Sequence, residues 1–400
     1  MAHSEAPLRV LVLASTFPRW SGDRQPAFIR DFCRHLPDCE VHVLAPGAAG
    51  AAAGENLDGV QVHRFRYAPL ARWQTLAYGG GMLANVRENP LRLLLLPPYL
   101  AAMLFAAWRL AIRHRIRIVH AHWIIPQGVV GALLRWLLPR TRLVVTAHGG
   151  DAYAFHGRIG RRLKRLVLRR ADAVTAVSTH LRNDLQRDLA PLRRPPAIAP
   201  MGIDLARFAV PATIRRRRFC FVGRLVEKKG VNDLLLAYAQ ARARMTNDFP
   251  DLLLVGDGPL RDAVATTIRR LDLTAHVTQA GWIDAAQVPQ VMAESLAVVV
   301  PSIVARDGDR EGLGLVAVEA LAAGTPVIAY DYGAIRDVVV PGTHGLLAPQ
   351  GDIEALAGLL AGAAGGSLPV IDDRVRADIR ARFDWQAVTA GYRALYRRLD

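Results

Sequence analysis

Short, continuous apolar runs recur along the chain, and longer segments of mixed apolar and polar residues separate them. Runs of this length are typical of strands that are buried on both faces of a parallel sheet. The segments between them, such as 27–36 and 158–170, have helix-compatible composition. The pattern predicts strands at residues 8–14, 41–46, 117–123, 142–148, 172–178, 219–224, 251–258, 276–282, 296–302 and 325–330.

The alternation of strands and helices pauses once and then restarts. It pauses at residues 195–208, ahead of four arginines at 215–218. Strands that alternate with helices build a mostly parallel sheet covered on both faces. A chain of 400 residues also exceeds what one hydrophobic core usually holds. We predict an α/β protein with two doubly wound domains, residues 1–205 and 206–375, and a C-terminal helix within 376–400 that packs back on the first domain.

Composition and cysteine content narrow the class of protein. Hydrophobic residues make up 52% of the chain, which excludes an intrinsically disordered protein. Cys33, Cys39 and Cys220 show no C-x-x-C spacing, so they indicate neither a disulfide framework nor a zinc site. The N-terminal residues lack the basic and apolar regions of a signal peptide. We therefore expect a cytoplasmic protein.

The net charge of +16 is concentrated in the first half of the chain. Residues 1–204 contain 28 Lys and Arg against 13 Asp and Glu, whereas the remainder is nearly balanced. Anionic lipid head groups, a polyanionic acceptor or nucleic acid would each be attracted to such a half, and a solvated Arg-rich surface explains it equally well. Nucleic acid is the least favoured, because no basic strand with interleaved aromatic residues is evident.

Two segments have features of membrane elements. Residues 93–108 are uncharged, but they contain Pro97 and Pro98 and are shorter than the roughly 20 residues of a membrane-spanning helix. We predict a buried helix with a proline-marked start. Residues 158–170 are basic with leucines at near-helical spacing, which fits either a solvated helix or one that lies on an anionic membrane surface. Peripheral association with the inner face of the cytoplasmic membrane therefore stays open.

The first candidate for chemistry is the loop at residues 222–230. It turns at Gly223 and presents Arg224 and Lys229 close together. Arginine makes bidentate contacts with phosphate oxygens, and lysine adds a point charge. The loop is a candidate diphosphate clamp, although surface cations in loops are more often simply solvated.

A glycine-rich turn at residues 306–324 supports this interpretation. Glycines surround Glu311, and a segment of helical composition follows. Main-chain N–H groups and the helix dipole make the start of such a helix a binding site for anions. The turn would lie beyond the carboxyl ends of a parallel sheet, where open α/β folds bind ligands. The main-chain amides of the turn belong to Gly312, Leu313, Gly314 and Leu315.

The spacing of two glutamates argues against a hydrolase. Glu311 and Glu319 are eight residues apart, which corresponds to about 12 Å of rise and about 80° of rotation on a helix. The carboxylates of a glycoside hydrolase lie about 5 to 9.5 Å apart on either side of one bond, so a hydrolytic pair is not favoured. Instead, Glu311 would lie near a reacting sugar, and Glu319 would accept hydrogen bonds from ribose hydroxyls.

Together these segments resemble the retaining glycosyltransferases of family 4, whose GT-B fold has two Rossmann-like domains facing a central cleft. The E-x7-E motif of that family corresponds to residues 311–319, and its G-R-L-x-x-x-K-G loop to residues 223–230. The resemblance covers nearly the whole chain. Four shorter motifs stand in the family's order: HGGD at 148–151, PMGID at 200–204, VGDGP at 255–259 and GWI at 281–283.

The resemblance implies a donor site in the second domain. Arg224 and Lys229 would hold the diphosphate of a nucleotide-sugar donor, and Glu319 would bind the ribose. Glu311 would contact the donor sugar, helped by the amides of residues 312–315. The nucleobase would lie near Trp282 and Ile283.

The same resemblance implies that the first domain binds the acceptor. His148 would face the transferred sugar, with Asp151 beside it. Gly22 and Asp23, in the loop after the first strand, would border the acceptor or the diphosphate.

The chain departs from the family pattern in two loops. It has RWSGDR at 19–24 where many members carry paired glycines, and DYGAIRD at 331–337 in place of G-G-x-x-E, so no donor contacts are carried over to that second loop. Residues 120–128 resemble a subset that acts in cell-surface polysaccharide or glycolipid synthesis. Within them, His120 and His122 face the same way on a strand, and we interpret them as hydrogen-bonded rather than catalytic.

The expected reaction is transfer of a hexose from a nucleoside diphosphate sugar to a hydroxyl of a lipid-linked or polysaccharide precursor, with retention of configuration. Cations and amides around the leaving group make a metal or other cofactor unnecessary. A GT-B sugar-nucleotide epimerase or phosphorylase is the alternative, and a non-catalytic binding protein is less favoured. A dehydrogenase is excluded, because the first strand is not followed by G-x-G-x-x-G.

Overall fold

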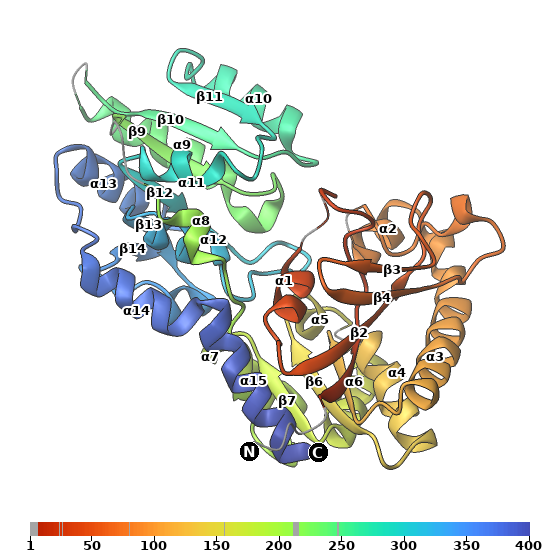
Figure 1. Ribbon diagram of the computed structural model, residues 1–400. Helices are drawn as coiled ribbons and strands as arrows, with labels where there is room; N and C mark the ends of the chain where they lie inside the picture. Colours follow the sequence, from red (N-terminus) through yellow and green to blue (C-terminus); the bar gives the residue numbers. More distant parts are fainter. Residues whose placement is uncertain are drawn as a thin grey trace. The chain divides into compact units, whose positions relative to one another are not determined.

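The chain forms two compact units in the computed structural model, which describes residues 7–23, 25, 27–79, 81–155, 157–210, 216–245 and 248–400 (Figure 1). The sequence placed the boundary near residue 205 and the start of the returning C-terminal segment at 376. In the structure, the unit boundary lies between residues 199 and 200, and residues 388–400 return to the first unit. Unit 1 comprises Met1–Val177, Leu181–Ala199 and Val388–Asp400, and unit 2 comprises Ser178–His180 and Pro200–Ala387.

Unit 1 is built on an eight-stranded sheet in the order β3-β4-β2-β1-β5-β6-β7-β8. Its neighbouring strands are parallel, except for an antiparallel β3–β4 hairpin at one edge. Its strands are β1 Leu8–Leu13, β2 Cys39–Pro46, β3 Gly54–Leu57, β4 Val60–Phe65, β5 Ile118–His122, β6 Arg142–Ala147, β7 Ala173–Ala176 and β8 Ala197–Ile198.

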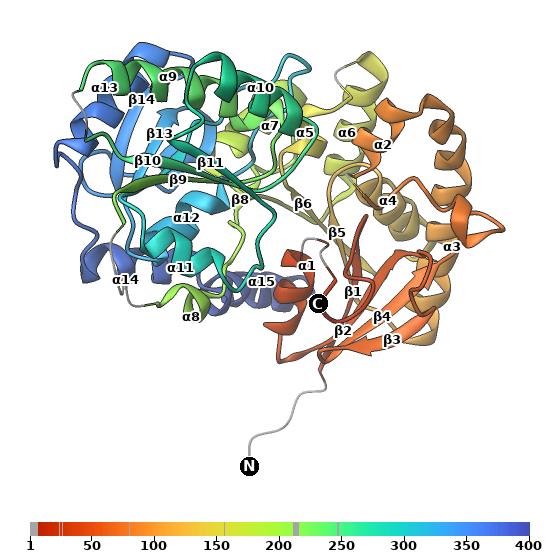
Figure 2. The ribbon, with the colours of Figure 1, turned by 90° about the horizontal axis from the view of Figure 1, so that it is seen from above.

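Helices cover both faces of this sheet (Figure 2). The last helix, α15, is tied to the sheet by two tyrosines: Tyr396 Oη lies 2.6 Å from His120 Nδ1, and Tyr392 Oη lies 3.1 Å from Thr146 Oγ1. The helical elements are α1 Phe28–Arg34, η1 Ala71–Trp73, α2 Met82–Glu88, η2 Pro90–Leu95, α3 Leu96–Arg113, α4 Gln127–Leu137, α5 Gly150–Tyr153, α6 Arg158–Arg170, α7 Thr179–Leu189 and α15 Trp385–Leu399, of which α7 and α15 begin with residues of unit 2.

The prediction of a buried helix at residues 93–108 is wrong. Its prolines do mark a helix start, because Pro97 and Pro98 occupy the first turn of α3. However, α3 packs on α4 and the sheet through one stripe only, Tyr99, Met103, Ala107 and Ala111. By length and composition the stretch Pro90–Arg113 would suffice to cross a membrane, and 17% of its apolar window is buried. The composition of residues 93–108 showed that the helix is apolar, but it could not show which side of the helix packs on the rest of unit 1.

Unit 2 contains a six-stranded parallel sheet in the order β11-β10-β9-β12-β13-β14. Its strands are β9 Arg218–Val222, β10 Asp251–Val255, β11 Val277–Gly281, β12 Ala297–Val300, β13 Val327–Asp331 and β14 Gly345–Pro349. Its helical elements are α8 Leu205–Phe208, η3 Glu227–Lys229, α9 Val231–Ala243, α10 Arg261–Arg270, α11 Val288–Ala293, α12 Leu315–Ala322, η4 Gly333–Asp337, α13 Ile353–Ala364 and α14 Asp373–Phe383.

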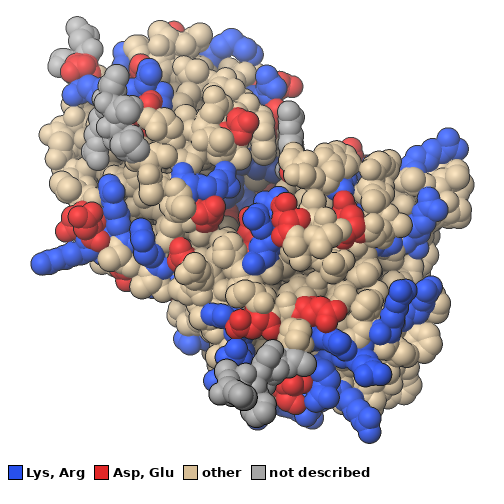
Figure 3. Space-filling model, viewed as in Figure 1, with Lys and Arg blue, Asp and Glu red and all other residues tan. Residues whose placement is uncertain are grey.

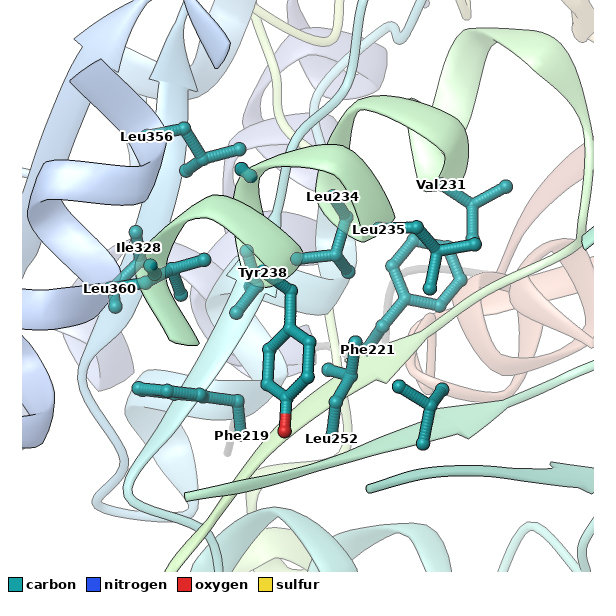
Figure 4. Packing of buried hydrophobic residues seen from close by; sticks show 14 of the residues in the cluster. Phe219, Phe221, Val231, Leu234, Leu235, Tyr238, Leu252, Ile328, Leu356 and Leu360 are labelled. Carbon is teal, nitrogen blue, oxygen red and sulfur yellow. The ribbon is translucent and has the colours of Figure 1, made fainter. Parts of the chain in front are cut away.

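A hydrophobic core of unit 2 forms where α9, α10 and α13 pack on the sheet (Figure 4). Leu234, Leu235 and Tyr238 of α9 point toward Phe219 and Phe221 of β9. These side chains are almost completely buried, and each such aromatic or leucine side chain stabilises the fold by about 1.5–3 kcal/mol through its removal from water. This packing fixes β9 and therefore the position of the loop that follows it.

The two doubly wound α/β domains of the prediction are confirmed, and each predicted strand corresponds to a strand of the structure. In both sheets, the strands that directly follow the first strand in the chain are added on one side of it, and the later strands are added on the other side. The strand order therefore reverses between β1 and β5 in unit 1 and between β9 and β12 in unit 2. These are the positions at which doubly wound sheets bind ligands.

Candidate functional site

In unit 2, the loops after β9 and β12 meet where the strand order reverses. β9 pairs in parallel with β12, so both loops begin at the carboxyl-terminal ends of the strands, on the same side of the sheet. Gly230 has a φ of 65°, and a Cβ atom there would lie 1.8 Å from the carbonyl oxygen of Pro301. Only glycine permits this approach of the two loops. The local sequence thus brings the predicted diphosphate clamp next to the predicted anion site.

Two ion pairs join these loops. Lys229 Nζ lies 2.7 Å from Glu311 Oε2, and Lys228 Nζ lies 3.1 Å from Asp309 Oδ2. Burial alone would raise the pKa of Glu311, but the charges of Lys229 and Lys228 outweigh it, and the pKa is lowered. Glu311 is therefore a carboxylate at neutral pH, held by a lysine that the sequence had assigned to the diphosphate.

Helix α12 begins at Leu315, four residues after Glu311. Its N-cap residue is Gly314, which has a φ of 85° and offers no side chain to cap the first turn. A glycine at this position leaves the first amides of the helix to other acceptors. The amides of residues 312–315 thus lie at the helix start, where the glycine-rich motif predicts an anion site.

Glu319 lies in the second turn of α12. Burial raises the pKa of Glu319 to about 7, and the charges of Lys229 and Arg207 offset only part of this effect. The two motif glutamates thus differ in state: Glu311 is ionised, whereas Glu319 is close to half protonated at neutral pH. The structure brings both acids within electrostatic reach of Lys229.

The remaining predicted donor residues lie in loops along the same edge of the sheet. Arg224 is exposed in the β9 loop, next to Gly223, whose main-chain N–H donates to the carbonyl of Val255. Trp282, which is 58% exposed, and the partly buried Ile283 follow β11, two strands away from β9. A small recess between these loops is lined by Leu225, Leu254, Gly256, Arg261, Gln279 and Gly281.

In unit 1, His148 follows β6 and contacts a histidine at the end of β5. The Nε2 atom of His148 lies 2.9 Å from Nδ1 of His122, and the two rings are stacked. Burial lowers the pKa of His148 to about 3, so its imidazole is neutral at physiological pH. His122 was not among the predicted site residues; its position two residues from His120 on one face of a strand was the available signal.

His120 confirms the interpretation of a hydrogen-bonded histidine. It is completely buried, with Nδ1 at 2.6 Å from Tyr396 Oη and Nε2 at 2.7 Å from Thr146 Oγ1. Both ring nitrogens form hydrogen bonds, so His120 links β5 to β6 and to α15.

Asp151 is 5% exposed, and its carboxylate is used by the protein itself. Oδ1 accepts the main-chain N–H groups of His148 and Gly149 at 3.0 and 3.1 Å, and Oδ2 accepts that of Ile124 at 2.6 Å. Burial raises the pKa of Asp151, and the main-chain hydrogen bonds oppose this effect. Asp151 therefore ties the loop after β5 to the loop after β6 and holds His148 in place.

Gly22 and Asp23 lie in the loop after β1. Gly22 is exposed and has a φ of 78°. The Asp23 side chain is 2% exposed and forms a two-pronged ion pair with Arg19, at 2.8 Å between Oδ1 and Nη2. Asp23 thus shapes this loop, and Gly22 lies at its surface.

Comparisons with known proteins agree with this geometry. Residues 26–207 match the model of the group described as Glycosyltransferase Family 4, and residues 204–363 match that of Glycosyl transferases group 1. The two matches adjoin and together span most of the chain.

Two curated relatives are similar over more than half of the chain. The glycogen synthase of Mycobacterium tuberculosis is 28% identical over 301 residues, 70% of this chain and 68% of its own. The 2-deoxystreptamine glucosyltransferase of Streptomyces kanamyceticus is 32% identical over 238 residues, 56% of this chain and 58% of its own.

Solved structures with the same fold cover the whole chain. Sucrose-phosphate synthase from Thermosynechococcus elongatus has a TM-score of 0.76 at 23% identity, covering 98% of this chain and 99% of its own. HepE of Anabaena, solved in complex with UDP, has a TM-score of 0.72 at 20% identity, covering 98% and 100%. With both halves of the chain matched and the motif residues gathered at one sheet edge, the protein belongs to the family 4 glycosyltransferases with the GT-B fold.

Proposed function

We propose that this glycosyltransferase moves a hexose from a nucleoside diphosphate sugar to a hydroxyl acceptor, with retention of the anomeric configuration. The observation that carries the proposal is the meeting of Lys229, Glu311 and the start of α12 where β9 and β12 end. A cation, a sugar-facing acid and free amides at one point suit the bond between a sugar and a diphosphate.

We infer the position of the donor from the charge and exposure of the site residues. The diphosphate lies against Arg224, Lys229 and the first amides of α12, which supply positive charge where β9 and β12 end. The ribose hydroxyls donate to Glu319, and the base lies beside the exposed Trp282 and Ile283. HepE has been solved with UDP and with UDP-glucose, which supports a uridine donor as the first to test.

In the chemical step, the bond between the sugar C1 and the diphosphate oxygen breaks, and a bond from C1 to the acceptor oxygen forms on the same face. The acceptor proton passes to a departing β-phosphate oxygen. Lys229 and the amides stabilise the charge that grows on the leaving group. Because Lys229 keeps Glu311 ionised, this carboxylate accepts hydrogen bonds from sugar hydroxyls and positions the ring.

We propose that transfer needs no metal ion, because Arg224, Lys229 and the start of α12 offset the charge of the diphosphate. The initial rate is expected to be the same with EDTA as with Mg²⁺. A rate that EDTA abolishes and Mg²⁺ restores contradicts this assignment.

The donor site is tested by thermal shift with UDP-, GDP- and ADP-sugars. One nucleotide class is expected to raise the melting temperature, because a ligand that binds the folded state stabilises it by mass action. The shift should disappear in Lys229→Ala and persist in Lys228→Ala, a neighbour that pairs with Asp309 instead. Equal shifts in both variants would place the diphosphate elsewhere.

Retention is tested by NMR of the product made from an α-linked donor. An α-linked product supports the proposal, and a β-linked product refutes it. Incubation of the donor alone examines the alternative epimerase or phosphorylase: release of a free altered sugar without an acceptor would favour it over transfer.

We further propose that the acceptor is lipid-linked and that unit 1 docks on an anionic membrane surface. The outward side of η2 and α3 is apolar: Leu91 and Leu94 are 72% and 74% exposed, and Phe105 and Ile112 are 58% and 52% exposed. We call this the η2–α3 face. Helix α4, which packs on α3, adds Trp136 at 67%.

Charge complementarity supports an anionic bilayer as the partner of the η2–α3 face. Residues 89–150 contain eight arginines and no Asp or Glu. Figure 3 shows Lys and Arg side chains set among uncharged ones along the side of unit 1 that carries α3. Apolar side chains interspersed with arginines match the interface of an anionic bilayer, where each basic residue adds about 1 kcal/mol.

Sedimentation with vesicles tests this docking. Binding to phosphatidylglycerol-containing vesicles is expected, with little binding to pure phosphatidylcholine. Leu94→Glu with Phe105→Glu should abolish it, whereas Val370→Glu, a change at an 82% exposed residue of unit 2, should not. Equal binding by all three proteins would refute the η2–α3 face as the docking surface.

A further inference from the structure

Three histidines of unit 1 gather outside the site described above. His42 lies on β2, His63 on β4, and His114 directly after α3. One ring nitrogen of each lies within 4.8 Å of those of the other two. His42 is 3% exposed, and the other two are partly buried. The sequence did not indicate this cluster, because its members are far apart along the chain and no cysteine takes part.

The nitrogens of His42 and His63 have the spacing of two ligands of a tetrahedral metal site. Zinc binds imidazole nitrogens at about 2.0–2.1 Å, which places neighbouring ligand atoms of a tetrahedron about 3.3 Å apart. Nδ1 of His42 and Nε2 of His63 are already 3.1 Å apart. His114 follows the end of α3, and one of its ring nitrogens lies within 4.8 Å of a ring nitrogen of each of the other two.

Glu40 orients the buried ligand. Its Oε1 lies 3.1 Å from His42 Nε2 and accepts a hydrogen bond from it. The other nitrogen, Nδ1, is then left with a lone pair that points at His63. Metal-binding histidines almost always give their second N–H to a carboxylate or carbonyl in this way. In the metal-free protein a proton bridges His42 and His63, and a cation would replace it.

The surrounding charges limit the affinity. Arg9 pairs with Glu40 at 3.0 Å, and Arg113 lies near enough to act on both His63 and His114. Nearby arginines and one carboxylate suit a site of micromolar rather than picomolar affinity.

We propose that His42, His63 and His114 form a binding site for Zn²⁺ or a similar divalent d-block cation, with solvent as the fourth ligand. The site is independent of the donor chemistry proposed above. A bound cation would link the C-terminal end of α3 to β2 and β4. It would thereby stabilise the position of α3, which carries the η2–α3 face.

Titration of chelator-treated full-length protein with ZnCl₂ tests the proposal. One equivalent is expected to bind with a Kd on the order of 1 μM and to raise the melting temperature. Co²⁺ should give the strong visible absorption of a tetrahedral centre, which Zn²⁺ then removes. This spectrum on the wild-type protein keeps the test valid if a variant fails to fold.

Variants locate the metal. His114→Asn should weaken Zn²⁺ binding at least as much as the roughly 10–100-fold expected for Glu40→Gln, since loss of a supporting carboxylate typically costs that much. His276→Asn, which alters a histidine of unit 2, should bind like the wild type. Absence of saturable binding up to about 100 μM, or equal affinity in all variants, would overturn the site and leave the histidines as packed neutral rings.

Discussion

Replacing Glu319 with Gln is expected to stabilise the ligand-free protein at about pH 8 and to have much less effect at about pH 5. Burial in α12 raises the pKa of this carboxyl to about 7 from an ordinary value of 4.5, against the opposing charges of Lys229 and Arg207. Each pKa unit corresponds to about 1.4 kcal/mol. The ionised side chain therefore costs the folded state about 3 kcal/mol.

The sign of this pH dependence follows from the number of protons that the folded and unfolded states bind at Glu319. Between about pH 4.5 and 7 the folded protein keeps a proton on Glu319 that the unfolded chain has lost. The stabilisation is fully present below pH 4.5 and is lost as the pH rises through 7. The advantage of Glu319→Gln should therefore grow across this window and level off above it. For a unit of this size, about 3 kcal/mol corresponds to roughly 6–12 °C in melting temperature.

Thermal melts of wild type and variant at about pH 5, 6, 7 and 8 measure this difference. Glu354→Gln is the matched control, because that glutamate lies on α13 of the same unit with its side chain 82% exposed. Its curve should parallel the wild type throughout. If Glu319→Gln also runs parallel to the wild type, the carboxyl is not held in the protonated form and the assignment of a burial cost fails.

Three further changes probe the site and its support. Lys229→Ala should lower kcat by about 100-fold or more in a transfer assay, because the charge it meets grows in the transition state, whereas Lys228→Ala should change it far less. Gly230→Ala should cost about 3 kcal/mol or more in a denaturant titration, since its Cβ would meet Pro301; Gly351→Ala, with a φ of 77° but open space around it, should cost about 1 kcal/mol. Asp151→Asn should lower the denaturation midpoint by an amount equivalent to about 1–3 kcal/mol, because an amide cannot accept all three N–H groups; an unchanged midpoint would contradict its role in the loop.

Most strands could be predicted from the sequence, whereas β3, β4, β8 and β14 could not. Strands such as β1 and β12 are covered on both faces, so they read as continuous apolar runs. Three of these strands, β3, β8 and β14, lie at sheet edges and are short with exposed positions. A short run with exposed positions cannot be told from a loop by its pattern alone.

The donor motifs showed which residues belong to the site but not how they interact. The pairing of Lys229 with Glu311 depends on Gly230, because only that glycine lets two loops 70 residues or more apart approach each other. In the same way, the sequence placed Asp151 beside His148 without showing that main-chain N–H groups occupy its carboxylate. Contacts of this kind arise from the tertiary fold and leave no periodic signal.

The features that make the donor site suitable for a diphosphate sugar also weaken the free protein. Burial raises the pKa of Glu319, so the folded protein disfavours its ionised form. The first turn of α12 also has no capping side chain. On the proposed function, the donor supplies what each of these lacks: hydroxyls for the carboxylate, and phosphate oxygens for the amides. Binding energy is then gained at a carboxyl group whose ionised form folding disfavours and at amides that no side chain caps. A substitution that repairs one of them within the protein, such as Glu319→Gln, must therefore stabilise the fold and weaken the donor complex together.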